Sequence, residues 1–188
     1  RAIKLHSGEY RGLTDADLAK RLRQPNPIAL RAGFANLAKH IENIKKFGLR
    51  AVVAINRFEA DSDEEIEIVR TMARASGAEE AEVSDVYTRG SEGGLALAEA
   101  VIRATSKGSN FRFLYEDSLS IREKIEKIAR EMYGAAGVRY SPLAEHRIAT
   151  FARWDFGRMP VCIAKTQLSL SDDPHLLGRP EGFVLDVE

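Results

Sequence analysis

The hydrophobic pattern of the chain alternates short, continuously apolar runs with segments of helical spacing. Ala51–Ile55 is continuously apolar, which is typical of a parallel strand buried on both faces. Pro160–Ala164 is interpreted in the same way, and further strands are predicted at Glu82–Tyr87 and Phe183–Val187. Alternation of such strands with helices predicts an α/β fold, with a mostly parallel sheet and helices on both of its faces.

Amphipathic helices are predicted where apolar residues recur three and four positions apart. Asn26-Pro27 marks the start of a helix that ends near Gly48, because asparagine caps helices and proline suits their first position. Ser62 and Glu65 have the spacing of a capping box ahead of the next helix. The apolar positions of the predicted helices are Leu30, Phe34, Leu37, Ile41 and Ile44; Ile66, Val69 and Met72; Leu95, Ala98 and Ile102; Ile121, Ile125, Ile128 and Met132; and Leu143, Ile148 and Phe151. In the last of these helices, Leu143, Ile148 and Phe151 are expected to point inward.

Composition narrows the classes of partner. Hydrophobic residues make up 44% of the chain and charged residues 30%, as is ordinary for a soluble globular protein. The 28 basic residues balance 28 acidic ones, so no net field attracts nucleic acid. No apolar stretch approaches the roughly 20 residues that cross a bilayer. We therefore expect neither a nucleic-acid partner nor a membrane.

The single cysteine and the first residue suggest where the chain operates. Cys162 lies in the apolar run 160–164 and has no second cysteine to pair with, which predicts a core thiol in a reducing compartment. The chain opens on Arg1 rather than methionine and shows no secretory leader. We expect its natural start to be missing or processed.

Three strand exits are candidate ligand sites, because open α/β sheets bind ligands beyond the carboxyl ends of their strands. They are Asn56–Phe58, Tyr87–Gly94 and Lys165–Ser171. Phe58 and Tyr87 are aromatic residues placed where strands end. Either they cover the edge of the sheet as part of the core, or they hold a flat heterocycle between two aromatic faces.

The glycine-rich turn Gly90–Gly94 also has two interpretations. Glycine tolerates positive φ and offers unshielded N–H groups, so the turn could approach a ligand closely. It could equally be the entry to the helix that follows. No Lys-Ser or Lys-Thr follows it, and Lys165-Thr166 lacks the preceding glycines, so the chain contains no Walker A sequence.

The remaining polar groups give weaker signals. The segment from Lys165 to Pro174 is rich in hydrogen-bonding side chains, which favour turns and also suit recognition of a polar ligand. The four histidines have no ligand spacing, so no metal site is expected. The acidic pairs are interpreted as helix-start and turn charges; they are Glu64-Glu65, Glu79-Glu80 and Asp172-Asp173.

Four stretches of the chain resemble the formate–tetrahydrofolate ligase family. They are Asn36–Ile44, Val53–Phe58, Gly90–Leu95, and Ala164–Pro174 continuing to Gly178-Arg179-Pro180. Their order and spacing match the C-terminal region of the family over essentially the whole chain. The resemblance implies that residues 1–25 form a partial strand and connecting loop. It implies that residues 26–188 form the C-terminal α/β domain of a P-loop-type ligase, on the folate side of its active site.

The resemblance also implies an activity and partners. Family enzymes join formate to tetrahydrofolate with ATP and Mg²⁺, by way of formyl phosphate, to give 10-formyltetrahydrofolate. The P-loop belongs to the N-terminal portion of these enzymes, so this chain alone should be inactive and should bind no cofactor firmly. A homo-oligomer in the cytoplasm is expected. The alternative is a stand-alone folate- or nucleotide-binding module, or a structural assembly domain.

The resemblance assigns binding residues but no catalytic residue. Phe58 and Tyr87 occupy the positions of two aromatic residues that sandwich the pterin, the second of which is typically tryptophan in the family. The other implied folate-binding residues are Asn56, Gly93 and Gly94. The implied nucleotide-side loop contains Lys165, Thr166, Gln167, Ser169 and Ser171.

Overall fold

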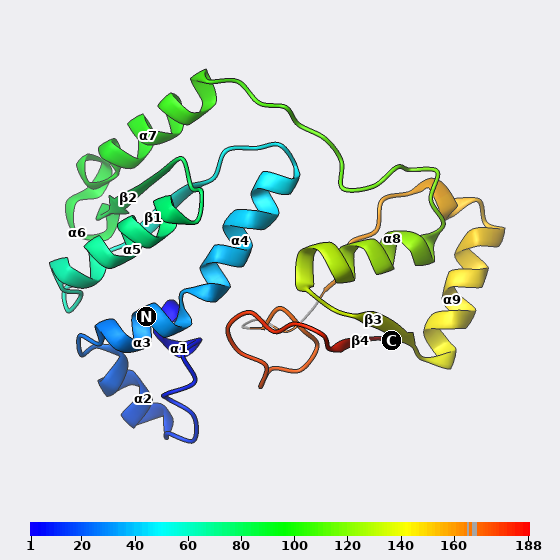
Figure 1. The fold of residues 1–188 in the computed structure, drawn as a ribbon, viewed down its shortest axis with the longest axis horizontal. Helices are drawn as coiled ribbons and strands as arrows, with labels where there is room; N and C mark the ends of the chain where they lie inside the picture. The colour runs from blue at the N-terminus through cyan, green and yellow to red at the C-terminus, as the bar shows by residue number, and fades with distance from the viewer. Residues whose placement is uncertain (165, 167–168) are drawn as a thin grey trace. The chain divides into compact units, whose positions relative to one another are not determined.

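The chain divides into two compact units, Arg1–Arg112 and Phe113–Glu188 (Figure 1). The computed structural model describes residues 1–164, 166 and 169–188. The first unit contains α1 (Ala2–Leu5), α2 (Asp15–Leu22), α3 (Pro27–Gly33), α4 (Ala35–Lys46), β1 (Val52–Asn56), α5 (Asp63–Ala75), β2 (Glu80–Ser84), α6 (Val86–Arg89), the 3-10 helix η1 (Gly90–Gly94) and α7 (Leu95–Ser106). The second contains α8 (Ile121–Ile128), the π-helix η2 (Ala129–Tyr133), β3 (Gly137–Tyr140), α9 (Pro142–Arg153), the 3-10 helix η3 (Phe156–Arg158) and β4 (Val184–Val187).

The predicted α/β class and the parallel strand pairing are confirmed. In the first unit β1 and β2 pair in parallel, from Val52 opposite Glu80 to Asn56 opposite Ser84. Helix α5 connects the two strands, and the strands lie between α5 and α7 (Figure 1). In the second unit β3 and β4 also pair in parallel. Each sheet has two strands among the residues that the structure describes.

The core of the first unit is formed where α3, α4 and α5 pack on the sheet. Its helical contributors include Leu30, Phe34 and Ile41 from the predicted apolar face, together with Val69 from α5. Helix α5 begins where the capping signal placed it, because the Ser62 hydroxyl accepts a hydrogen bond from the Glu65 N–H at 3.2 Å. Local capping chemistry therefore fixes the helix that connects the two strands.

The helix predicted from Asn26 to Gly48 is two helices that meet at Phe34. The Phe34 N–H donates to the Arg31 carbonyl at 3.3 Å, a three-residue spacing that tightens the end of α3. Gly33 packs against α1 so closely that a Cβ there would overlap the carbonyl oxygen of Ile3. The apolar spacing continues through this break, which is why the pattern predicted one helix.

Two predicted strands are corrected by the structure. Residues 160–164 form no strand. The predicted strand at the C-terminal end, β4, pairs with β3, a strand that the sequence analysis did not predict. The Tyr115 hydroxyl lies 2.9 Å from the donating Val161 N–H, and the Tyr133 hydroxyl donates to the Ile163 carbonyl at 3.4 Å. Backbone groups of this run thus bond to tyrosine side chains rather than to a neighbouring strand.

The second correction concerns β2, which ends at Ser84 rather than Tyr87. Residues 86–89 turn into α6, so Tyr87 lies on a helix. At the other end of the chain, the partial strand expected within residues 1–25 is wrong, because Ala2–Leu5 form α1. Within the same stretch, Asp15–Leu22 form the helix α2.

The acidic pair Glu79-Glu80 at the start of β2 forms ion pairs instead of acting as turn charges. Arg103 binds Glu80 at 2.7 Å, and this hydrogen bond lowers the pKa of the Glu80 carboxyl. Hydrogen bonds from Lys107 and Arg50 likewise lower the pKa of Glu79. These pairs tie β2 to α7 and to the residues that precede β1.

In the second unit the apolar face of α8 and η2 is buried as predicted, whereas α9 departs from expectation. Ile125, Ile128 and Met132 are buried. Leu143 and Phe151 on α9 are exposed, contrary to prediction. The Phe151 ring instead joins an exposed cluster with Trp154 and Phe156, at centroid distances of 6.2 and 6.5 Å.

Cys162 is exposed, so the expectation of a core thiol is wrong. Its burial was inferred from a strand that does not form at residues 160–164. Among the residues that the structure describes, no helix has both the length and the hydrophobicity that crossing a membrane requires.

We expect the Cys162 thiol to react in the native chain, because an exposed sulfur is accessible to reagent. Ellman's reagent should titrate one thiol per chain without denaturant, and Cys162→Ser should abolish the signal. Reaction only after addition of guanidinium would show that the thiol is buried and would contradict the expectation.

Candidate folate site

Strands β1 and β2 end side by side at one edge of the first sheet. Asn56 lies opposite Ser84, and the Arg57 N–H donates to the Ser84 carbonyl at 3.0 Å, one residue beyond β1. Phe58 follows this last hydrogen bond of the ladder, and Tyr87 follows β2 by three residues. The two aromatic residues are therefore carried by neighbouring strand exits, the place where open α/β sheets bind ligands.

The segment after β1 is held by a closed turn. The Phe58 N–H donates to Oδ2 of Asp61 at 3.0 Å, and the Asp61 N–H donates to the Phe58 carbonyl at 2.9 Å. Ser62 then caps α5, and Arg57 forms an ion pair with Asp63 at 2.9 Å. Hydrogen bonds thus fix the backbone between the end of β1 and the start of α5.

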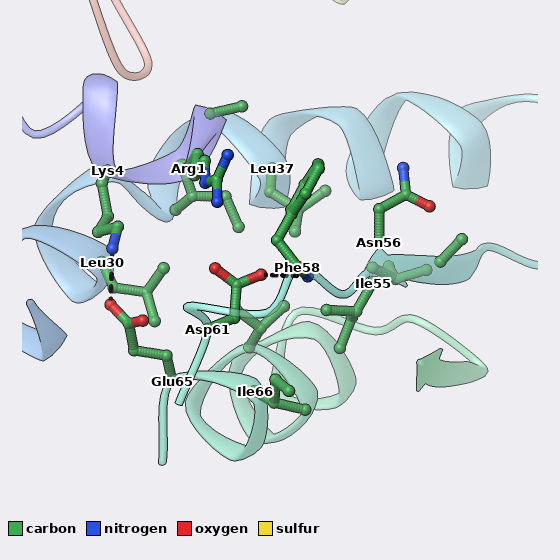
Figure 2. A pocket seen from close by; sticks show the side chains of 15 residues that line it. Arg1, Lys4, Leu30, Leu37, Ile55, Asn56, Phe58, Asp61, Glu65 and Ile66 are labelled. Atoms are coloured by element: carbon green, nitrogen blue, oxygen red, sulfur yellow. Dashed lines mark hydrogen bonds and ion pairs between the residues drawn. The ribbon is translucent and has the colours of Figure 1, made fainter. Parts of the chain in front are cut away.

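A cavity of about 320 Å³ lies beside this turn (Figure 2). Apolar side chains from α3, α4, β1 and α5 form much of its wall, and charged side chains lie at the end near α1. The lining residues are Arg1, Ala2, Ile3, Lys4, Leu30, Leu37, Val53, Ala54, Ile55, Asn56, Phe58, Asp61, Glu65, Ile66 and Val69. Two predicted folate-binding residues, Asn56 and Phe58, belong to this set, whereas Tyr87, Gly93 and Gly94 do not.

A buried ion pair closes one end of the cavity. Lys4 Nζ lies 3.0 Å from Oε1 of Glu65, and these residues are only 2% and 5% exposed. Lys4 also donates to the Gln24 carbonyl at 2.9 Å, and the same Glu65 oxygen accepts the Asn26 N–H at 2.8 Å. The pair therefore joins α1, the turn before α3 and the first turn of α5.

The sequence analysis missed this pair because it interpreted Glu64-Glu65 as helix-start charges. Glu64 is exposed and fits that reading, but Glu65 is buried and its carboxylate turns toward Lys4. Only the Ser62 half of the predicted capping box is therefore observed. The sequence did contain one sign of the pair. Lys4 lies between Ile3 and Leu5, and a lysine buried among apolar residues indicates an acidic partner, because lysine is rarely buried unless it is paired.

The Phe58 ring is partly covered. Its exposed fraction is 47%, and the Arg1 guanidinium lies 4.2 Å from the ring centroid, within the range of a cation–π interaction. The ring borders the cavity (Figure 2). The interpretation of Phe58 as a core residue does not fit this exposure.

The Tyr87 ring is 99% exposed on α6, so it also is no core residue. The glycines after it fold back on the exit of β2. The Asp85 N–H donates to the Gly93 carbonyl at 3.0 Å, and a Cβ on Gly93 would overlap the Asp85 carbonyl oxygen. Gly90 has a φ of 59°, which favours glycine. Gly93 thus approaches the chain's own backbone, and the turn leads directly into α7.

The loop assigned to the nucleotide side lies in the second unit. The Thr166 hydroxyl donates to the Ser171 carbonyl at 2.8 Å. Ser169 and Ser171 are buried, and their hydroxyls donate to the carbonyls of Leu176 at 2.6 Å and Asp173 at 3.0 Å. These bonds are turn chemistry within the segment. The other two assigned residues, Lys165 and Gln167, lie outside the described residues.

Comparison with known proteins identifies the family. The sequence profile described as formate–tetrahydrofolate ligase matches residues 1–188. The chain therefore belongs to the formate–tetrahydrofolate ligase family, as its sequence motifs indicated. The mitochondrial C-1-tetrahydrofolate synthase of Saccharomyces cerevisiae is 44% identical over 187 residues, which cover 100% of this chain and 19% of that relative. The chain thus spans about a fifth of the length of this curated relative.

Proposed function

We propose that this chain supplies the folate-binding side of a formate–tetrahydrofolate ligase. In this proposal it works within a longer enzyme, which joins formate to tetrahydrofolate with ATP to give 10-formyltetrahydrofolate by way of formyl phosphate. The family match over residues 1–188 supports the reaction class. The observation that carries the folate assignment is the position of two exposed aromatic side chains, Phe58 and Tyr87, at neighbouring strand exits.

Exposed rings at a strand exit suit a pterin for a physical reason. A flat heterocycle can stack on an aromatic side chain without any change in the backbone, and stacking removes both surfaces from water. Arg1 covers part of the Phe58 ring, so a pterin would use the opposite face or displace the guanidinium. Asn56 is exposed at the end of β1 and offers an amide for the polar edge of the ligand.

The loop that cradles the ATP phosphates, and the residues that hold formate and Mg²⁺, are assigned to parts of the enzyme outside this chain. Phosphoryl transfer requires a lysine and a cradle of backbone N–H groups around the transferred group, and this sequence contains no Walker A loop. Within the described parts of the chain, no cluster of His, Cys, Asp or Glu could hold a metal ion. We therefore place no step of the reaction on Mg²⁺ here, and the chain by itself should release no ADP in a formate-dependent assay.

In the second unit the proposal keeps the nucleotide-side loop, which contains Lys165, Thr166, Gln167, Ser169 and Ser171. The hydroxyls of Thr166, Ser169 and Ser171 donate within the loop and keep their acceptor lone pairs. The homo-oligomer and the cytoplasmic location that the resemblance implies remain predictions.

The test is titration calorimetry of the full-length protein with tetrahydrofolate. We expect Tyr87→Trp to keep or tighten binding, because it restores the larger ring that is typical of the family at this position. Tyr87→Ala should weaken binding about 5- to 150-fold, since stacking contributes roughly 1–3 kcal/mol per ring. The side chain is fully exposed, so neither change should disturb the fold.

Two outcomes would overturn the proposal. One is a full-length protein that binds ATP and formate but shows no heat of binding with tetrahydrofolate. The other is an affinity for tetrahydrofolate that is the same for wild type, Tyr87→Ala and Phe58→Ala, because the aromatic residues would then have no part in binding.

A further inference from the structure

The Phe58 backbone is held by one side chain. The β1–β2 ladder ends with the Arg57 N–H, so the next residue has no strand partner. In place of a strand partner, the Asp61 carboxylate accepts a hydrogen bond from the Phe58 N–H at 3.0 Å (Figure 2). The return bond from the Asp61 N–H to the Phe58 carbonyl, at 2.9 Å, closes the turn. Both polar backbone groups of Phe58 are thus bonded to one residue.

The ring itself has little else to fix it. With 47% of its surface exposed, Phe58 gains less from packing than a core phenylalanine, and its observed ring contact is with Arg1. A stacking residue must nevertheless present its ring in one orientation, because stacking depends on the alignment of the two planes. The backbone of Phe58 places the start of the side chain and limits its rotamers, and the two hydrogen bonds with Asp61 hold that backbone.

We propose that Asp61 is a positioning residue that holds the Phe58 ring in the orientation that stacks on the folate ligand. This inference rests on the proposed folate function. Asp61 acts on the ligand through the turn, in which its Oδ2 accepts the Phe58 N–H. The function requires an acceptor oxygen rather than a negative charge, so an amide at this position can replace the carboxylate.

The matched variants are Asp61→Ala, Asp61→Asn and Asp63→Ala. Asp61→Ala removes the acceptor, and Asp61→Asn keeps an acceptor oxygen of the same reach. Asp63→Ala removes a carboxylate two residues away that is 88% exposed and forms an ion pair with Arg57. Thermal unfolding of each variant, followed by circular dichroism, identifies any loss that comes from the fold.

The experiment is a double-mutant cycle in the full-length protein, read by calorimetric titration with tetrahydrofolate. Asp61→Ala should weaken binding about threefold to tenfold, the effect of losing one hydrogen bond. Asp61→Asn and Asp63→Ala should remain within about twofold of wild type. In the Phe58→Ala background, Asp61→Ala should change affinity by less than about twofold, because no ring remains to be positioned.

Each result decides the question. Unchanged affinity in Asp61→Ala overturns the inference, as does an equal loss with and without the Phe58 ring. Failure of Asp61→Asn to restore binding overturns it as well, since the charge would then be the property required. Equal affinity for wild type, Phe58→Ala and Tyr87→Ala refutes the folate function itself, so the two failures are distinguishable.

Discussion

Replacing Lys4 with methionine is expected to lower the free energy of unfolding by about 3–5 kcal/mol, the cost of breaking a buried ion pair. Methionine keeps the length of the side chain but removes the charge that compensates the Glu65 carboxylate. That carboxylate is 5% exposed and would be left with the Asn26 N–H as its remaining observed donor. The Gln24 carbonyl would lose its bond from Lys4 at the same time.

Urea unfolding followed by circular dichroism measures this loss, and two further variants locate its cause. Arg57→Met removes a cation whose partner, Asp63, is 88% exposed, so it should cost less than about 1 kcal/mol. Adding Glu65→Gln to Lys4→Met should recover part of the stability. Glutamine removes the buried charge, and its amide oxygen can still accept the Asn26 N–H. A loss below 1 kcal/mol in Lys4→Met would contradict the buried-pair interpretation.

Replacing Phe58 with alanine should weaken tetrahydrofolate binding by the full-length protein about 5- to 150-fold, which corresponds to roughly 1–3 kcal/mol of stacking. The loss should appear in the affinity and not in the fold, because the ring is 47% exposed and lies outside the buried core of the unit. Phe58→Tyr should retain binding, since it keeps an aromatic face in the same place.

The matched control for this prediction is Phe113→Ala. It makes the same chemical change at a phenylalanine that is 75% exposed and is not part of the candidate site. Calorimetric titration should give this variant the affinity of wild type. Equal affinity for wild type and Phe58→Ala would remove Phe58 from the folate site.

Features that depend on nearby residues could be predicted from the sequence. The strand β1 follows from a continuous apolar run, and α3 and α5 follow the predicted caps Asn26 and Ser62, whose side chains accept the expected N–H bonds. The positions of Phe58 and Tyr87 at neighbouring exits also follow from parallel pairing. Each of these features depends on neighbouring residues in the sequence or on a general property of parallel sheets.

Features that depend on distant partners could not be predicted. Residues 160–164 have the pattern of a strand, but their backbone bonds to Tyr115 and Tyr133, far away in the sequence. Lys4 and Glu65 are separated by 61 positions, and no periodicity connects them. Tyr87 was placed at a strand end because Val86, Tyr87 and Thr88 are residue types that favour strands and give no sign of the short helix α6.

The Lys4–Glu65 pair also sets an order of events during synthesis on the ribosome. Glu65 is added 61 residues after Lys4, which at 5–20 residues per second is a delay of roughly 3–12 seconds. Throughout that interval Lys4 cannot form its ion pair, because Glu65 has not been synthesised. A four-residue helix such as α1 is too short to be stable in water by itself. The buried pair that anchors residues 2–5 therefore cannot form until the first turn of α5 has been synthesised.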